Sequence, residues 1–253
     1  MSAIYRSIFS HIQVRLTVPL CARSFFPKRY ISHTSTERLQ FNLSLYLVAD
    51  RQAIQDEDKF FSKIIEAVKG GVSCVQLRDQ RSDFATAVKT ANCLKKMLKS
   101  IGIPLMINTP DLIEVARAAN ADGVYLEQPF SSLEARRLLG KKAIIGTPVK
   151  TMNEVLAAEQ NYEIDYISVK IFPSKQTNPG EREVWGIEGL NKIRSISRHR
   201  IIAIGGINAE NAASVYSKIH FNDGIAMTGD LLRGDDPYTL AQKIQAIRSW
   251  IKE

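Results

Sequence analysis

The feature that most restricts the fold of this chain is a regular alternation of short apolar runs with longer helical patterns. About eight such units follow one another from Leu43 onward. The apolar runs carry few polar positions, which is typical of parallel strands buried on both faces. The alternation predicts an α/β protein, a single (β/α)8 TIM barrel over residues 41–253, with a doubly wound open sheet as the alternative.

The predicted elements have the lengths expected of strands and helices. Strands are predicted at Leu43–Ala49, Val72–Leu77, Pro104–Ile107, Gly123–Leu126, Ala143–Gly146, Tyr166–Phe172, Ile201–Ile204 and Gly224–Met227. Helices are predicted at Asp58–Lys69, Phe84–Lys99, Asp111–Ala119, Ser131–Leu139, Thr151–Gln160, Ile187–Ser197, Glu210–Ile219 and Tyr238–Ile251. A barrel brings the carboxyl ends of its strands to one rim, so we expect the functional residues there.

Residues 1–40 differ in composition from the rest of the chain. They contain six basic residues and one acid, Glu37, and apolar residues recur at Ile4, Ile8, Ile12 and Leu16. An Arg- and Ser-rich amphipathic segment of this kind is typical of mitochondrial targeting leaders. The sequence therefore predicts a leader or a disordered extension, and a mitochondrial location, with a cytoplasmic one if no leader acts.

Composition excludes several classes of partner. Residues 41–253 carry 28 basic and 25 acidic side chains, an ordinary balance that argues against nucleic-acid binding. No apolar run approaches the roughly 18–20 residues of a membrane span. The three cysteines show no CxxC spacing, which argues against a zinc site. The sequence leaves the oligomeric state open and permits a homo-oligomer.

Two glycine turns follow the last two predicted strands. The first is Gly205-Gly206 in IIAIGGI, and the second contains Gly229 after Thr228 in DGIAMTGDL. A helix N-terminus behind a glycine loop favours a phosphate, and barrel enzymes often bind phosphate after their last two strands. The alternative is that these glycines only shape turns.

Polar residues gather at the end of the second predicted strand. Alternation places Gln76, Arg78 and Gln80 on one face. A guanidinium fork beside amide donors can hold phosphate or diphosphate oxygens. The alternative is an internal pair between Arg78 and a carboxylate in the barrel mouth. Further rim candidates are Asn108, Glu127 and Lys150, and the loop after the sixth strand, with Ser174, Lys175, Gln176 and Thr177, could cover the site.

An ordered series of motifs, from YLVAD and VQLRD through IIAIGGINAENA to DGIAMTGDLL, resembles the thiamine phosphate synthase and TenI (thiazole tautomerase) superfamily. The resemblance covers residues from Leu45 to Leu231. For the synthase it implies substitution at a hydroxymethylpyrimidine diphosphate: diphosphate leaves, and the nitrogen of thiazole phosphate attacks the carbocation. Small phosphorylated pyrimidines and thiazoles are then the expected ligands.

The resemblance also implies site residues. Gln76, Arg78 and Asn108 match the pyrimidine side, and Gly206, Thr228 and Gly229 match the thiazole phosphate side. Other positions depart from the family pattern. The strand-two lysine is Gln80, the two Mg²⁺-binding aspartates are Thr109 and Phe130, the serine after strand five is Pro148, and the loop lysine is Thr177.

These departures leave three functions open. Without its usual ligands, Mg²⁺ would have to be held by Glu127, Asp79 or Asp111, and we predict no metal ligand. A diverged synthase is the first function. The second is a metal-free tautomerase, in which Lys150 stands where that branch carries its proton-transferring histidine. The third is a non-catalytic barrel that binds a phosphorylated ligand.

Overall fold

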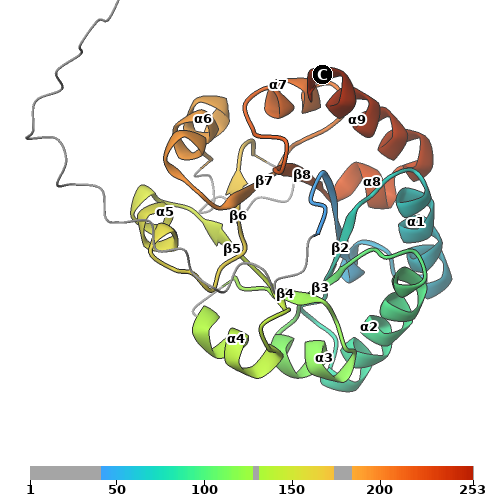
Figure 1. Cartoon of the computed structure of the whole chain (residues 1–253). Helices are drawn as coiled ribbons and strands as arrows, with labels where there is room; N and C mark the ends of the chain where they lie inside the picture. The colour runs from blue at the N-terminus through green and yellow to red at the C-terminus, as the bar shows by residue number, and fades with distance from the viewer. Residues whose placement is uncertain (1–40, 128–130, 174–183, 253) are drawn as a thin grey trace, which may run out of the picture. The chain divides into compact units, whose positions relative to one another are not determined.

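The computed structural model describes residues 41–127, 131–173 and 184–252. The predicted leader, Phe130 and the predicted cover with Lys175 and Thr177 lie outside these residues. Eight parallel strands form a closed barrel in the order β1 to β8, and helices surround it (Figure 1). The barrel closes where Leu45 of β1 pairs with Ile225 of β8. The single (β/α)8 barrel is therefore confirmed.

The strands are β1 Leu45–Asp50, β2 Cys74–Arg78, β3 Leu105–Asn108, β4 Gly123–Tyr125, β5 Ile144–Val149, β6 Tyr166–Lys170, β7 Arg200–Ile204 and β8 Gly224–Met227. The longer helices are α1 Glu57–Lys69, α2 Phe84–Lys99, α4 Ser132–Leu139, α5 Met152–Glu159, α6 Gly186–Ile196 and α9 Pro237–Lys252. Shorter helices are η2 Arg51–Ala53, α3 Leu112–Ala118, α7 Ala212–Tyr216 and α8 Gly229–Arg233. No helix in the described ranges combines the length and apolarity needed to cross a membrane.

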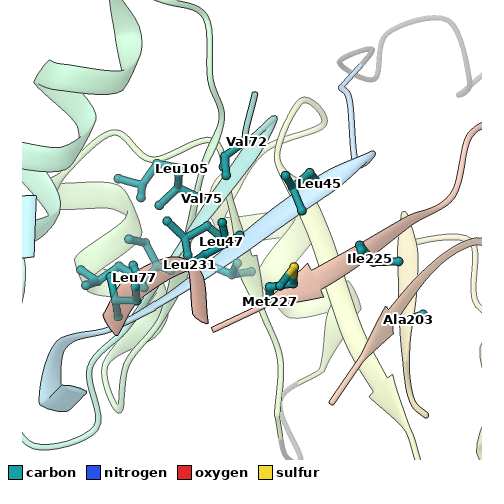
Figure 2. Close-up of a cluster of buried hydrophobic side chains, with 14 of the residues drawn as sticks. Leu45, Leu47, Val72, Val75, Leu77, Leu105, Ala203, Ile225, Met227 and Leu231 are labelled. Carbon is teal, nitrogen blue, oxygen red and sulfur yellow. The ribbon is translucent and has the colours of Figure 1, made fainter. Parts of the chain in front are cut away.

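Each strand buries both faces, in two separate layers. The outer layer packs between strands and helices, and Figure 2 shows part of it with Leu47, Val75 and Leu77. Burying each such side chain contributes roughly 1.5–3 kcal/mol relative to leaving it exposed. The inner layer fills the barrel with the alternate residues of the same strands, among them Tyr46 and Tyr166. The two layers together explain why the strands have an almost unbroken apolar sequence.

Aromatic side chains occupy the middle of the barrel. Tyr166 lies within 6.5 Å, between ring centroids, of both Tyr46 and Tyr125. Gly146 of β5 provides the space, since a Cβ added there would lie 2.0 Å from Cζ of Tyr166. The Tyr125 hydroxyl is hydrogen-bonded to Oγ of Ser168 at 2.6 Å. The middle of the barrel is thus packed with side chains.

Polar residues just before the helices cap their first turns. Asp83 accepts a hydrogen bond from the N–H of Thr86 at the start of α2, and Thr151 accepts one from Glu154 at the start of α5, as its spacing predicted. The predicted helix Glu210–Ile219 is too long. Oδ1 of Asn208 accepts the N–H groups of Glu210 and Asn211, which holds these residues in a turn, so α7 begins at Ala212.

At the amino end of the barrel, the same kind of hydrogen bond, from a backbone N–H to a side chain, joins neighbouring strands in four places. The residue before each even-numbered strand accepts the N–H at the start of the preceding odd-numbered strand with its side chain. The acceptors are Ser73, Asp122, Asp165 and Asp223, and the donors are Leu45, Leu105, Ile145 and Ile201. The three aspartates also pair with cations from α2, α4 and α6, namely Lys95, Arg136 and Arg194. These ion pairs serve stability, since barrel enzymes carry their active sites at the opposite end.

Candidate active site

The inner-face alternation continues to the carboxyl end of every strand and places a ring of residues around the barrel mouth. The ring consists of Asp50, Arg78, Asn108, Glu127, Pro148, Lys170, Ile204 and Thr228. Six of these eight side chains are polar or charged, whereas the layer beneath them is mainly apolar. A polar ring above an apolar plug can bind small polar molecules but not enclose large ones.

Gln76 lies one step below the ring and is held from β1. The Tyr46 hydroxyl donates to Oε1 of Gln76 at 2.9 Å and is itself 2.9 Å from the Tyr166 hydroxyl. Burial raises the pKa of Tyr46 well above its ordinary value, with a smaller contribution from Tyr166, so the hydroxyl stays protonated and donates. Because Oε1 is occupied in this way, the Gln76 amide group is left to donate to a ligand.

Arg78 is also positioned from β1. Its Nη1 lies 3.2 Å from Oδ2 of Asp50, the residue paired with it in the parallel register. The Asp50 side chain is 13% exposed and that of Arg78 is 38% exposed. The internal pair considered as an alternative is therefore present. It fixes the guanidinium at the mouth while more than a third of the side chain remains open to solvent.

Gln80 and Asn108 bind each other. Nε2 of Gln80 donates to both the main-chain oxygen and Oδ1 of Asn108 at 3.1 Å, and Nδ2 of Asn108 donates to the carbonyl of Tyr125. Both polar ends of the Asn108 side chain are thus occupied within the protein. Gln80, which stands where the resembling family has a lysine, orders this strand end and adds no charge to it.

The described residues do not fit a resident Mg²⁺ ion. Thr109, at one expected aspartate position, has a buried hydroxyl without a hydrogen-bond partner, and a neutral hydroxyl is a weak substitute for a carboxylate. Asp79 is fully buried; its Oδ1 accepts from Gln52 and from the N–H of Ser82, whereas its Oδ2 is buried without a hydrogen-bond partner, so it offers one carboxylate oxygen and not a set of ligands. Across the ranges that the structure describes, no three His, Cys, Asp or Glu side chains could hold a metal together.

The two glycine corners lie side by side, because Ile204 at the end of β7 pairs with Ala226 near the end of β8. Gly205 and Gly206 have φ of +90° and +58°, which side-chain-bearing residues rarely adopt. A Cβ at Gly206 would also lie 2.8 Å from the carbonyl oxygen of Pro173. The turn-shaping role is therefore present. Thr228 and Gly229, half-buried, begin α8 beside it, so the two corners are neighbours at the carboxyl ends of β7 and β8.

Lys150 follows β5 and belongs to neither glycine corner. Its side chain is exposed, and its backbone N–H donates to Oε2 of Glu154 at 2.5 Å, which completes the capping of α5. It lines a cavity of about 260 Å³ together with Glu127, Thr147 and Glu154. The partial burial on which the proton-transfer interpretation depended is absent, and that interpretation stays a prediction.

Sequence reasoning missed Tyr46, Asp50 and Lys170. The first two could have been found from YLVAD, because alternation puts both on the inner face. Lys170 follows Tyr166 and Ser168 on the inner face of β6 and is half-buried. Its place at the mouth was missed because the predicted strand Tyr166–Phe172 continues for two more residues, whereas β6 ends at Lys170.

Comparison with known proteins decides the family. The family model described as thiamine monophosphate synthase matches residues 45–230. The chain belongs to the thiamine monophosphate synthase family. The matched range runs from the first residue of β1 to α8, so it contains the whole mouth and both glycine corners.

Individual proteins of the thiamine monophosphate synthase family agree with this assignment. The chain is 38% identical over 189 residues to the thiamine-phosphate synthase of Clostridium acetobutylicum, covering 74% of this chain and 86% of that one. It is 33% identical over 205 residues to that of Vibrio parahaemolyticus, covering 80% and 97%. The solved thiamine phosphate pyrophosphorylase from Pyrococcus furiosus superposes with a TM-score of 0.72 at 26% identity, covering 83% and 96%. The resemblance found in the motifs is therefore confirmed.

Proposed function

We propose that this chain is a thiamine phosphate synthase, which joins a hydroxymethylpyrimidine diphosphate to thiazole phosphate. The observation that carries the proposal is the pair Gln76 and Arg78, fixed at the mouth by Tyr46 and Asp50. Relatives at 33–38% identity are named thiamine-phosphate synthase, which supports the same reaction.

In this reaction the C–O bond between the pyrimidine methylene and the diphosphate breaks, and the diphosphate leaves with the electron pair. The lone pair of the thiazole nitrogen then forms the C–N bond to the methylene carbocation. Arg78 binds diphosphate oxygens as negative charge builds on them, and the Gln76 amide donates to the same group. The glycine corners hold the thiazole by its phosphate, so that its nitrogen faces the methylene.

The test incubates purified protein with both substrates and added Mg²⁺, and measures thiamine phosphate and released diphosphate. We expect product, and a loss of about 100- to 1,000-fold in rate in Arg78→Ala, the usual cost of one preorganised charge-stabilising group. The matched control is Arg117→Ala, since Arg117 is exposed in the last turn of α3, a helix that starts after β3 at the mouth and runs toward the opposite end of the barrel. Absence of product from the wild-type protein at high concentration would reject the proposal.

A second candidate is a tautomerase that acts on a thiazole phosphate without metal. It is favoured by the neutral Thr109 at a position where the synthase pattern has an aspartate. If the chain has this function, deuterium from the solvent should enter the thiazole. The variant Lys150→Ala should abolish that exchange. Exchange that is unchanged in the variant removes Lys150 from the mechanism. Thermal stabilisation by thiazole phosphate, with neither turnover nor exchange, would indicate a binding protein.

We also propose that residues 1–40 act as a mitochondrial leader, from their basic and amphipathic composition. The test fuses residues 1–40 to a fluorescent protein and follows its location in cells. The matched control changes Arg6, Arg15 and Arg23 to glutamate, which keeps the length and the apolar stripe. Diffuse fluorescence from the unchanged fusion would contradict the proposal.

A further inference from the structure

Lys170 stands on the inner ring next to Ile204, the residue that leads into the first glycine corner. On β6, Ile167 and Val169 pack in the outer layer, while Tyr166 is in the inner layer and Ser168 bonds to Tyr125 inside the barrel. The next residue on that inner face is Lys170, so its side chain rises from the interior into the mouth. It pairs in register with Ile204, the last residue of β7.

The lysine stem lies over the face of Gly205 where other residues carry a side chain. A Cβ added at Gly205 would lie 3.1 Å from Cγ of Lys170 and 2.8 Å from the carbonyl oxygen of Phe172. The missing side chain of Gly205 therefore leaves room for the aliphatic part of the lysine. The stem therefore starts toward the mouth next to the corner, within the length of one lysine side chain of the main chain at Gly205 and Gly206.

Basic groups lie at other places of the mouth, and one of them, Arg233 of α8, has its Nη2 3.0 Å from where a Cβ added at Gly229 would stand. Arg78 is paired with Asp50 on the β1–β2 side, and Gln80 supplies an amide where the family pattern has a lysine. Within the described part of the ring, Lys170 is the basic residue on the β6–β8 side. A phosphate monoester carries close to two negative charges at neutral pH, and a lysine ammonium is a compact partner for it.

We propose that Lys170 binds the phosphate group held at the Gly205–Gly206 and Thr228–Gly229 corners. This inference rests on the proposed function for its choice of ligand, thiazole phosphate, but concerns binding and not turnover. Lys170 is thus a substrate-binding residue of this chain on the thiazole phosphate side of the mouth, and it supplies a positive charge from strand β6.

The experiment measures binding of thiamine monophosphate, and separately of inorganic phosphate, to the full chain by calorimetry. The variants are Lys170→Met, which keeps the stem, Lys170→Arg, which keeps the charge, and the control Lys142→Met, an exposed lysine before β5 at the opposite end of the barrel. Loss of one charge-assisted hydrogen bond predicts roughly 10- to 100-fold weaker binding in Lys170→Met. Lys170→Arg should restore most of the affinity, and Lys142→Met should equal the wild type.

The outcomes separate this inference from the function on which it rests. Binding that depends on Lys170 without synthase turnover supports the lysine and rejects the synthase. Turnover with wild-type affinity in Lys170→Met supports the synthase and overturns the role of the lysine. If neither phosphate compound binds the wild-type protein, or if Lys142→Met weakens binding as much as Lys170→Met, the inference is also overturned. Circular dichroism of each variant checks that it is folded.

Discussion

At the scale of single residues, the mouth is built by pairs that cross from one strand to the next. Tyr46 and Asp50 bind no ligand in the proposed reaction, yet each orients a side chain of β2 that does. A side chain that is held in advance loses less freedom when it binds, so part of the cost of ordering the site is met during folding. The residues that matter are therefore more numerous than those that touch the substrate.

Tyr46→Phe tests this supporting role. The change leaves Oε1 of Gln76 and the hydroxyl of Tyr166 without their shared partner in a buried place, which should lower the free energy of unfolding by about 1–3 kcal/mol. Urea unfolding measures it. Tyr238→Phe is the control, since Tyr238 is exposed and its hydroxyl accepts a surface hydrogen bond from Gln242. Equal losses in both variants would show that burial of the hydroxyl pair is not the cause.

Gly146→Ala tests the packing of the barrel interior. The added methyl would lie 2.0 Å from Cζ of Tyr166, too close for any ordinary contact, so the ring or the strand has to move. Overpacking of this kind typically costs about 1–3 kcal/mol, which thermal unfolding would detect as a lower Tm. An unchanged Tm would mean that the tyrosine has room to withdraw.

At the scale of elements, much of the architecture was predictable, because local sequence patterns predict the strands and the longer helices. Alternation placed Gln76, Arg78 and Asn108 at one rim without any structure. It could not show that Asp50 faces Arg78, since the register between parallel strands depends on how helices pack between them. The five-residue helix α8 was missed because it is too short to show a helical period.

The hydrogen bonds and ion pairs that join the amino ends of the strands give a prediction at this scale. Asp223 and Arg194 have side chains that are 2% and 9% exposed, and Asp223 also accepts the N–H groups of Ile201 and His220. Asp223→Asn leaves Arg194 as a buried charge without a counter-charge, so the free energy of unfolding should fall by about 3–5 kcal/mol.

The matched control for this change is Glu57→Gln on α1, which breaks an exposed pair with Lys89. Surface pairs contribute about 0–1 kcal/mol, and the two variants should differ accordingly in urea unfolding. Similar losses of unfolding free energy in both variants would mean that water reaches the Asp223–Arg194 pair and screens it.

At the scale of the whole molecule, the buried tyrosines set a limit on alkaline stability. Burial is the main cause that raises the pKa of Tyr46, Tyr125, Tyr166 and Tyr216 above the ordinary value. The folded state therefore keeps protons that the unfolded state releases above about pH 10, so unfolding becomes easier as the pH rises beyond that point.

The measurement follows tyrosine ionisation by absorbance near 295 nm together with circular dichroism from pH 8 to 12. We expect the last tyrosines to ionise together with the loss of structure, and not before it. Full ionisation while the dichroism of the folded protein persists would contradict this, and would mean that solvent reaches the barrel interior.

The closure of the barrel by β1 on β8 has a consequence for how the chain is made. β1 is synthesised first but its second neighbour comes roughly 180 residues later, and α9, which packs on α1 and bonds through Gln245 to Gly71, later still. Until then a growing chain is an open sheet with two unpaired edges, which invite pairing with other chains. A ribosome-bound intermediate should for this reason depend on chaperones up to the last few dozen residues of translation.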